Sequence, residues 1–218
     1  MELILRAAVL LLLLSRCEAA EETCGLTGQV KEGHLDKVLG VRWVKVRAFS
    51  DFENGLAVLR KSQSTVLLME MMEDNVTVAC VERNVEAEKC LVFYTNMTTP
   101  EDKTSNHTLV LMNTGVEAND TSCIPYEDQG KYDIYSSCDD CMTLIYHMTW
   151  DNVHCRMLQF FRREGKHTDS EELKASEQQI METAKCLKFN TEYHFTYNGT
   201  AGFCEKNKVH RGDECFLS

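Results

Sequence analysis

The sequence predicts an all-β domain, either a sandwich or an up-and-down barrel, that carries one helix near its C-terminal end. Eight short segments of strand composition follow one another at near-regular spacing, turn-forming residues separate them, and a single later segment has strong helical periodicity. Short connections between successive strands favour antiparallel neighbours over a βαβ arrangement. The 218 residues of the chain are enough to bury a full core within one domain.

The eight predicted strands are Trp43–Phe49, Ser64–Met72, Val76–Glu82, Lys89–Thr95, His107–Met112, Lys131–Ser136, Met142–Thr149 and Cys155–Arg163. The segments between them are rich in turn formers and are predicted to be turns or loops: Ser50–Gly55, Glu73–Asn75, Asn84–Glu88, Asn96–Asn106, Asn113–Gly130 and Asp151–Asn152. Ahead of the strands, Glu21–Val38 is predicted to be partly helical, because Val30, His34, Leu35 and Val38 share a helical face.

The predicted helix is Ser170–Lys188. Asp169 is one of three adjacent N-cap candidates, and two glutamates follow in the first turn, where the helix dipole favours acidic groups. Its apolar side chains form one stripe at helical spacing, at Leu173, Ile180, Ala184 and Leu187. A helix with one apolar stripe packs on another element, and the outside of the sheet is the simplest place for it.

The charge of the chain argues against a nucleic-acid-binding protein. There are 34 acidic and 23 basic side chains, which give a formal net charge of −11, and no cluster of Lys and Arg exceeds two or three residues. Neutralising phosphates requires a basic surface. We therefore expect no nucleic-acid partner.

The N-terminal residues are predicted to be a signal peptide over residues 1–19, which leaves a single domain over 20–218. The apolar run Ala7–Leu14 is too short to span a bilayer, and the small residues Cys17 and Ala19 form a plausible cleavage site. No later stretch is long and apolar enough to cross a membrane. The prediction is a secreted protein without stable membrane insertion.

Cysteines and glycosylation sequons agree with secretion. Ten cysteines follow the predicted cleavage site, an even number that indicates disulfides in an exported chain. Five sequons lie in polar, turn-like contexts and predict a glycoprotein with glycans at Asn75, Asn96, Asn106, Asn119 and Asn198.

The Cys138–Cys141 motif has the spacing of a redox pair or of half a zinc site. A redox pair requires its first cysteine at a helix N-terminus, yet the residues that follow have a strand pattern, and the two aspartates inside the motif raise a neighbouring thiol pKa. A zinc site requires a second ligand pair, and His147, His154 and Cys155 lack that spacing. Structural disulfides, to each other or to more distant cysteines, are the favoured interpretation, and no metal site is predicted.

Other catalytic motifs are absent from the sequence. There is no G-x-S-x-G, no Gly-rich phosphate loop and no H-E-x-x-H, and the seven histidines are scattered along the chain. The sequence therefore predicts neither an enzyme nor a cofactor. The triplet Arg211–Asp213 matches an integrin-binding motif, but a tripeptide is a weak signal.

Several motifs together resemble the lipocalins. Gly40–Trp43 follows the first predicted helical segment, Leu158–Gly165 has the form of a last barrel strand with its basic residue, and the order from Ala184 through Asn198 to Glu205 follows the same pattern. Within that superfamily the chain is similar to the branch of alpha-1-acid glycoprotein and apolipoprotein M, and to the fish saxitoxin-, tetrodotoxin- and tributyltin-binding proteins. The extra residue in Gly40–Trp43 is a departure from the family pattern.

The resemblance implies an eight-stranded up-and-down antiparallel barrel over about 40–163, a helix outside it over about 170–188, and a Cys-bearing tail over 189–218. It also implies two disulfides, Cys24 with Cys186 and Cys90 with Cys204. It assigns no partners to Cys80, Cys123, Cys138, Cys141, Cys155 and Cys215.

The same resemblance, combined with strand alternation, implies the residues that face the barrel interior. The predicted ligand-binding residues are Leu91, Phe93, Leu144, Tyr146, Met148, Gln159 and Phe161. Arg163 is expected to lie over Trp43 at the closed end as a cation–π contact. If Trp43 faces inward, Lys45 and Arg47 share its face, so either the first strand contains a bulge or the cavity contains positive charge, which would suit an anionic head group.

The predicted function is the binding and transport of a small hydrophobic or amphipathic ligand in plasma or a similar fluid, by a monomer. Lipids, steroids, organotins and guanidinium toxins are the candidate classes. The alternative is an extracellular immunomodulatory or interaction glycoprotein with a filled barrel, whose partner would be a cell-surface receptor. A third hypothesis, an enzyme of the prostaglandin synthase kind, requires a reactive inward cysteine.

Overall fold

The computed structural model describes residues 24–112, 114–119, 122–127 and 129–204. The predicted signal peptide and the Arg211–Asp213 triplet lie outside the described residues. The strands are β1 (Arg42–Ser50), β2 (Ser62–Met71), β3 (Val78–Glu86), β4 (Lys89–Thr98), β5 (Leu109–Leu111), β6 (Thr114–Ala118), β7 (Cys123–Glu127), β8 (Lys131–Cys138), β9 (Cys141–Trp150), β10 (Val153–Arg163) and β11 (Phe195–Thr196).

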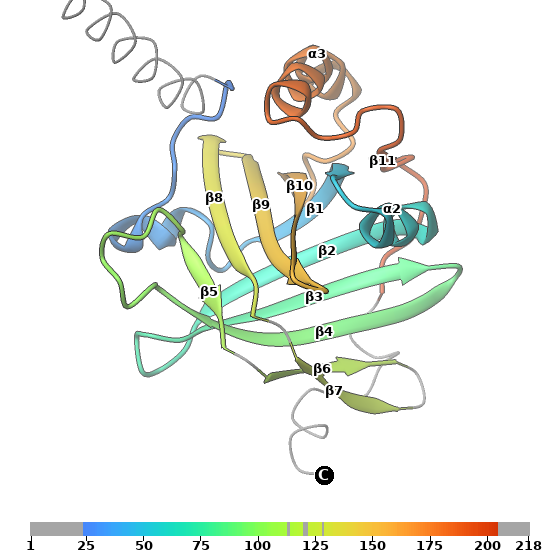
Figure 1. Ribbon diagram of the computed structural model, residues 1–218. Helices are drawn as coiled ribbons and strands as arrows, with labels where there is room; N and C mark the ends of the chain where they lie inside the picture. Colours follow the sequence, from blue (N-terminus) through green and yellow to red (C-terminus); the bar gives the residue numbers. More distant parts are fainter. Residues whose placement is uncertain (1–23, 113, 120–121, 128, 205–218) are drawn as a thin grey trace, which may run out of the picture.

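Eight of these strands close into an antiparallel barrel. The strands pair in the order β3-β2-β1-β10-β9-β8-β5-β4, and β4 returns to pair with β3, so no edge is left in the ring. Each barrel strand overlaps one of the eight predicted strands, and the prediction of an up-and-down barrel is confirmed. Figure 1 shows the ring of strands with the one long helix outside it.

Two parts of the chain differ from the sequence prediction. The helix α2 (Glu53–Lys61) begins inside the segment predicted as a turn at Ser50–Gly55, and it buries Leu56 and Leu59. The segment Asn113–Gly130, predicted as a loop, contains the hairpin of β6 and β7, which adds to β4 outside the ring (Figure 1). Pro125 is tolerated in β7 because β7 pairs on one side only.

The N-terminal helical segment is shorter than predicted. It is the 3₁₀ helix η1 (Glu32–Lys37), which buries Leu35 while His34 is exposed. Val30 and Val38 flank it and are fully buried against the closed end of the barrel. The apolar residues of the predicted face therefore do pack together, but not as one α-helix.

The helix α3 (Ser170–Cys186) packs on the outer face of the barrel, as predicted. The Asp169 carboxylate accepts a hydrogen bond from the backbone N–H of Glu172 and caps the N-terminus. The helix ends before Lys188, which has a φ of 64° and leaves the right-handed region. Ala184 is buried against Phe49 and Leu158, two outward-facing barrel residues.

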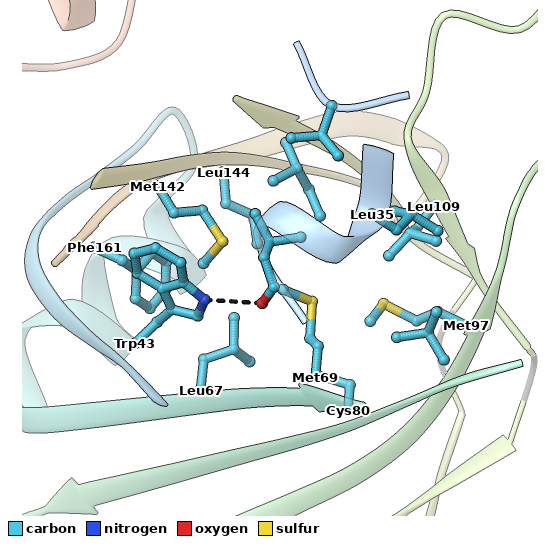
Figure 2. Packing of buried hydrophobic residues seen from close by; sticks show 14 of the residues in the cluster. Leu35, Trp43, Leu67, Met69, Cys80, Met97, Leu109, Met142, Leu144 and Phe161 are labelled. Carbon is cyan, nitrogen blue, oxygen red and sulfur yellow. Dashed lines mark hydrogen bonds between the residues drawn. The ribbon is translucent and has the colours of Figure 1, made fainter. Parts of the chain in front are cut away.

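The main hydrophobic core fills the closed end of the barrel (Figure 2). Trp43 is fully buried there, and its indole Nε1 donates a hydrogen bond of 3.0 Å to the carbonyl of Val38. The surrounding side chains come from nearly every strand of the ring and include Leu67, Met69, Val78, Met97, Leu109, Ile134, Met142, Leu144 and Phe161. A region packed this way contributes stability and leaves little space for a ligand.

Three disulfides join pairs of described cysteines. Cys24 bonds Cys186, and Cys90 bonds Cys204, the two pairings that the lipocalin resemblance implies. Cys138 bonds Cys141, which resolves the choice left open by the sequence. Cys123 is also disulfide-bonded. Cys80 and Cys155 are buried free thiols, so the even number of cysteines does not mean that all of them are paired.

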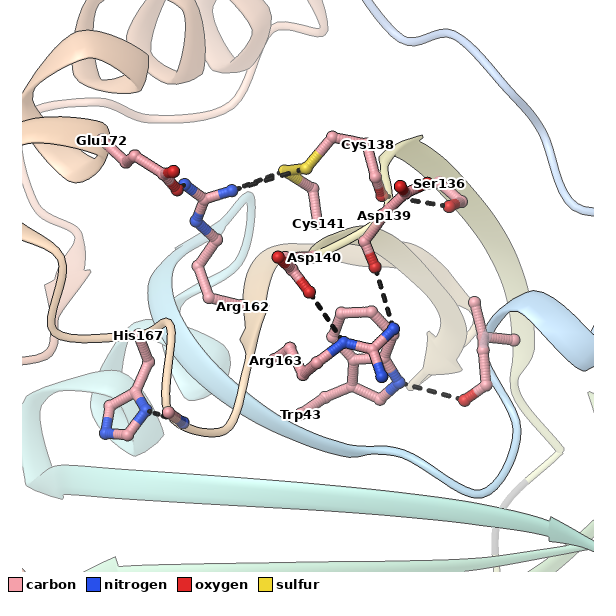
Figure 3. A network of polar contacts seen from close by, with 12 residues as sticks. Trp43, Ser136, Cys138, Asp139, Asp140, Cys141, Arg162, Arg163, His167 and Glu172 are labelled. Atoms are coloured by element: carbon pink, nitrogen blue, oxygen red, sulfur yellow. Dashed lines mark hydrogen bonds and ion pairs between the residues drawn. A yellow bond between two sulfur atoms is a disulfide. The ribbon is translucent and has the colours of Figure 1, made fainter.

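Polar contacts cover the closed end (Figure 3). The guanidinium carbon of Arg163 lies 5.7 Å from the centroid of the Trp43 ring, and its Nε donates to Asp140 at 2.7 Å. Next to it, Arg162 pairs with Glu172 of α3 and donates to the sulfur of Cys141. The barrel, the Cys138–Cys141 turn and the helix are therefore held together at this end. Among the described residues, no helix has the length and apolarity needed to cross a membrane.

Candidate functional site: the mouth of the barrel

The barrel interior opens into a cavity at the end opposite Trp43. The cavity has a volume of about 420 Å³, within the roughly 300–1,000 Å³ range of small-molecule sites. Its walls come from α2 and from strands on all sides of the ring. The lining residues are Lys45, Phe52, Asn54, Gly55, Val58, Ser62, Cys80, Glu82, Asn84, Glu86, Leu91, Phe93, Thr95, Tyr132, Tyr146, Met148, Met157 and Gln159.

One wall of the cavity is apolar and aromatic. The rings of Tyr132 and Tyr146 stack with their centroids 4.9 Å apart, across the β8–β9 pair. Gly130 allows this arrangement, because a Cβ there would lie 2.0 Å from the Tyr146 ring. Met148 and Met157 continue this wall on β9 and β10. Adaptable thioether side chains beside aromatic faces suit an apolar ligand surface.

The opposite wall is polar and comes from β3. Strand alternation turns Cys80, Glu82, Asn84 and Glu86 toward the cavity. Lys45 of β1 meets this row, with its Nζ 3.7 Å from the Glu82 carboxylate. The charged groups among the lining residues are thus one ammonium and two carboxylates.

Burial shifts the ionisation of these groups. Desolvation lowers the pKa of Lys45, although the nearby Glu82 and Glu86 carboxylates act in the opposite direction. Desolvation also raises the pKa of Glu86, against the attraction of Lys45. Both shifts favour the neutral forms of Lys45 and Glu86. A charged ligand group in the mouth would therefore change the fraction of each residue that is ionised.

A β-bulge in β1 determines which basic side chains point into the cavity. Lys45 pairs with Phe161 and Arg47 with the adjacent Phe160, so Val46 is the extra residue between them. Lys45 therefore points inward, while Arg47 points outward to Glu177 of α3 at 3.0 Å. The first strand has the bulge that the sequence suggested, and the cavity also contains a lysine. Because two glutamates accompany it, the expectation that this charge suits an anionic head group does not follow.

Gln159 has a buried acceptor without a partner. Its side chain is 7% exposed, and its Oε1 makes no hydrogen bond. It lines both the mouth cavity and a much smaller space below it. An unsatisfied buried amide costs free energy unless another group bonds it, so the position favours a ligand that donates a hydrogen bond.

The predicted ligand-binding residues divide between the two ends. Leu91, Phe93, Tyr146, Met148 and Gln159 line the mouth cavity. Leu144 and Phe161 lie at the closed end instead, around a space of about 10 Å³, and both are 3% exposed. All seven side chains face inward, but strand alternation alone does not indicate how far along the barrel the packed core extends.

The helix α2 is a part of the site that the sequence analysis missed. It follows β1 directly, and Asn54 and Val58 line the mouth beside Phe52. Gly55 packs so closely on the preceding turn that a Cβ would lie 2.2 Å from Ser50 Oγ. The spacing of Leu56 and Leu59 was the only available signal for a helix of this length.

The inward thiol of Cys80 does not have the character of a nucleophile. Burial raises its pKa to about 12, with a contribution from Glu82. The thiolate is the reactive form, and it is scarce at neutral pH when the pKa is this high.

The predicted glycosylation sites lie at the surface. The side chains of Asn75, Asn106 and Asn198 are exposed, and those of Asn96 and Asn119 are half-buried. This placement is compatible with attached glycans, and their occupancy stays a prediction.

The histidines are less scattered than the sequence suggests. His107, Asp133 and His147 come together on the outer wall of the barrel, although 40 residues separate the two histidines in sequence. No sequence motif joins these residues, because the contact depends on the pairing of strands that are distant in the chain.

The closed eight-stranded barrel, the bulged first strand, Trp43 under Arg163 and the external helix define a lipocalin fold. Solved structures agree. The siderocalin Ex-FABP matches with a TM-score of 0.54 and 12% identity over 77% of this chain and 97% of that chain. Siderocalin Q83 matches with a TM-score of 0.53 and 12% identity, over 80% of this chain and 97% of that chain. The odorant-binding protein OBP1 matches with a TM-score of 0.50 and 12% identity, over 78% of this chain and 94% of that chain. At this identity the likeness establishes the fold alone.

Sequence comparison adds a distant homology. The chain is 27% identical over 190 residues to saxitoxin and tetrodotoxin-binding protein 1 of Takifugu pardalis, which covers 87% of this chain and 46% of the relative. It is also 27% identical over 214 residues to saxitoxin and tetrodotoxin-binding protein 2 of the same pufferfish, a match that covers 95% of this chain and 51% of the relative. The chain spans about half the length of the curated relatives it matches. No family model matches it.

Proposed function

We propose that the protein binds and carries a small amphipathic molecule in the mouth of its barrel. The observation that carries this proposal is the cavity of about 420 Å³ with one apolar wall and one polar wall. Burying the apolar part of a ligand against Tyr132, Tyr146 and Met148 gains roughly 25 cal/mol per Å² of surface removed from water. The polar groups then select and orient the head group.

The polar wall favours a head group that is positively charged and donates hydrogen bonds. Glu82 and Glu86 outnumber Lys45, and Gln159 adds an unpaired acceptor. A guanidinium or ammonium group satisfies all of these acceptors. The names of the pufferfish relatives, which bind saxitoxin and tetrodotoxin, point to the same class of guanidinium compounds. Lipids, steroids and organotins are the other candidate classes.

Secretion into plasma or a similar fluid is the second part of the proposal. Disulfides at Cys24, Cys90 and Cys138 require an oxidising compartment, and the sequon asparagines reach the surface. We propose a monomeric secreted glycoprotein.

Neither alternative has comparable support. An interaction protein with a filled barrel predicts no cavity of roughly 300 Å³, whereas the mouth is larger than this. An enzyme of the prostaglandin synthase kind requires a reactive inward thiol, and Cys80 has a pKa of about 12.

The test is isothermal titration of the secreted, glycosylated chain with saxitoxin, a steroid, a fatty acid and a trialkyltin chloride. We expect saturable one-to-one binding that is tightest for the guanidinium compound. The variant Gln159→Leu should weaken that binding about tenfold, since it removes the buried acceptor. The matched control Gln178→Leu changes an exposed glutamine of α3 and should have no effect. Absence of saturable binding for every compound would refute the carrier function.

A further inference from the structure

Three potential metal ligands converge on the outer wall of the barrel, away from the mouth cavity. His107 Nδ1 lies 2.8 Å from Asp133 Oδ1, and His147 Nε2 lies 2.7 Å from Asp133 Oδ2. The three ligand atoms all lie within 4.8 Å of one another. Each imidazole thus directs one ring nitrogen at the same carboxylate.

The barrel wall holds these groups in place. Asp133 and His147 belong to β8 and β9, which lie side by side in the barrel (Figure 1). Along these strands they alternate with Tyr132 and Tyr146, which face inward and line the mouth cavity. His107 precedes Thr108, whose backbone and hydroxyl bond the neighbouring strand and Val30. Two ligands therefore come from paired strands and the third lies next to an anchored threonine, which reduces the cost of bringing them to an ion.

The cluster is also accessible. The side chains of His107, Asp133 and His147 are 26%, 14% and 18% exposed, so a hydrated ion can reach them and keep water on its open side. The exposed ring of His154 lies beside His147, with centroids 5.5 Å apart.

We propose that His107, Asp133 and His147 form a binding site for a divalent transition-metal ion of the zinc class. Two imidazoles and one carboxylate are a donor set that Zn²⁺ accepts, with bonds of about 2.0–2.2 Å and a water as fourth ligand. Ligands around such an ion lie roughly 3.3 Å apart by tetrahedral geometry. The present separations, 2.7 and 2.8 Å to Asp133 and at most 4.8 Å among the three ligand atoms, lie on either side of this spacing.

The ion would replace the present hydrogen bonds to Asp133. Each imidazole must offer an unprotonated nitrogen, so the bound form carries the ring proton of His107 on Nε2 and that of His147 on Nδ1. No covalent bond within the protein is broken. The site is separate from the mouth cavity and does not depend on the proposed carrier function.

The experiment is titration of ZnCl₂ into the full, oxidised and glycosylated chain. Glycosylation matters because His107 is the middle residue of the Asn106 sequon. We expect one saturable site, with the dissociation constant raised at least about tenfold in each of Asp133→Asn, His147→Ala and His107→Ala. The control His34→Ala removes an exposed histidine of η1 and should leave the constant within about twofold. Circular dichroism identifies any variant that does not fold, and the zinc affinities of the folded variants then test the proposed site.

A Co²⁺ titration adds an independent readout of the ligand set. The wild-type chain should develop the visible absorption of a low-coordinate nitrogen and oxygen site, and the three variants should lose it. Equal zinc affinity in the wild type and the folded variants would overturn the proposal, as would no zinc binding at all; the cluster would then be a hydrogen-bonded brace only. A thiolate-to-cobalt band would also overturn it, because the ion would then be at Cys80 or Cys155.

Discussion

The closed end and the mouth of the barrel share the same strands but have different interiors. On β1, Trp43 packs in the core while Lys45, the next inward residue, reaches the cavity. On β10, Phe161 is surrounded by apolar side chains while Gln159 leaves an acceptor unpaired. On these two strands the interior changes from filled and apolar to open and polar within two residues.

This difference separates stability from recognition. A filled end lined by large apolar side chains keeps the ring closed without help from the mouth. The mouth is then able to contain buried charge, an unsatisfied amide and a cavity, each of which costs stability. Substitutions of inward-facing side chains at the closed end should therefore change the free energy of unfolding, and substitutions of side chains that line the mouth cavity should change affinity.

The largest expected effect is the loss of Trp43. Trp43→Ala removes a fully buried ring and its hydrogen bond to Val38, and should lower the free energy of unfolding by about 3–5 kcal/mol in urea titrations. Val58→Ala at the mouth, where Val58 is 46% exposed, should cost under about 0.5 kcal/mol. Similar losses at both positions would contradict the division between the two ends.

The second prediction compares the stability lost when a disulfide at the mouth is removed with the stability lost when one at the closed end is removed. Cys90 and Cys204 are 114 residues apart in sequence, whereas Cys138 and Cys141 are 3 apart. Since longer loops gain more from closure, replacing Cys90 and Cys204 by serine should cost about 2–4 kcal/mol.

Replacing Cys138 and Cys141 by serine should cost less than that, because the closed loop is short. Thermal and urea unfolding of the two double variants measures the difference. A larger loss from the short loop would show that the contacts of the Cys138–Cys141 turn with Arg162 and Arg163 matter more than chain entropy.

The sequence predicted the elements with strong periodicity. The eight barrel strands and α3 have clear alternation or a clear apolar stripe, and the structure has all of them. The helix α2 was missed because it has nine residues and begins among turn formers. The β6–β7 hairpin was missed because Gly115 and Pro125 interrupt its pattern.

The sequence predicted which side chains face the barrel interior, but not how far along the barrel the packed core extends. Alternation placed Tyr146 and Phe161 on the inner face, yet only the packed structure assigns one to the mouth and the other to the core. Glu82 and Glu86 were overlooked because glutamates in a strand are usually expected to face water. Their inward direction depends on closure of the ring through the β3–β4 pairing.

A smaller effect concerns the mouth charges alone. The double variant Glu82→Gln with Glu86→Gln should weaken binding of a long-chain trimethylammonium amphiphile about tenfold, because the ammonium loses both carboxylates. The variant should also lose some stability, because it removes the carboxylates beside the buried Lys45 ammonium.

The matched control is Glu70→Gln with Glu73→Gln, which removes the same charge from exposed positions. It should leave the affinity nearly unchanged at physiological salt, where distant exposed charges are screened. Equal weakening in the two double variants would mean that the net charge of the chain attracts the ligand and that the mouth glutamates have no particular role.

The smallest expected effect is a pH dependence of this same binding. Desolvation raises the pKa of Glu86 above its ordinary value of 4.5, so acid protonates it and leaves Lys45 balanced by Glu82 alone. Affinity for the amphiphile should therefore rise several-fold as pH increases through the raised pKa. A permanently charged ligand is used because it does not titrate itself. In Glu86→Gln this rise should disappear, since the variant lacks the titrating group; a rise that persists there would assign it to another residue, and a flat wild-type profile would mean that Glu86 does not face the bound cation.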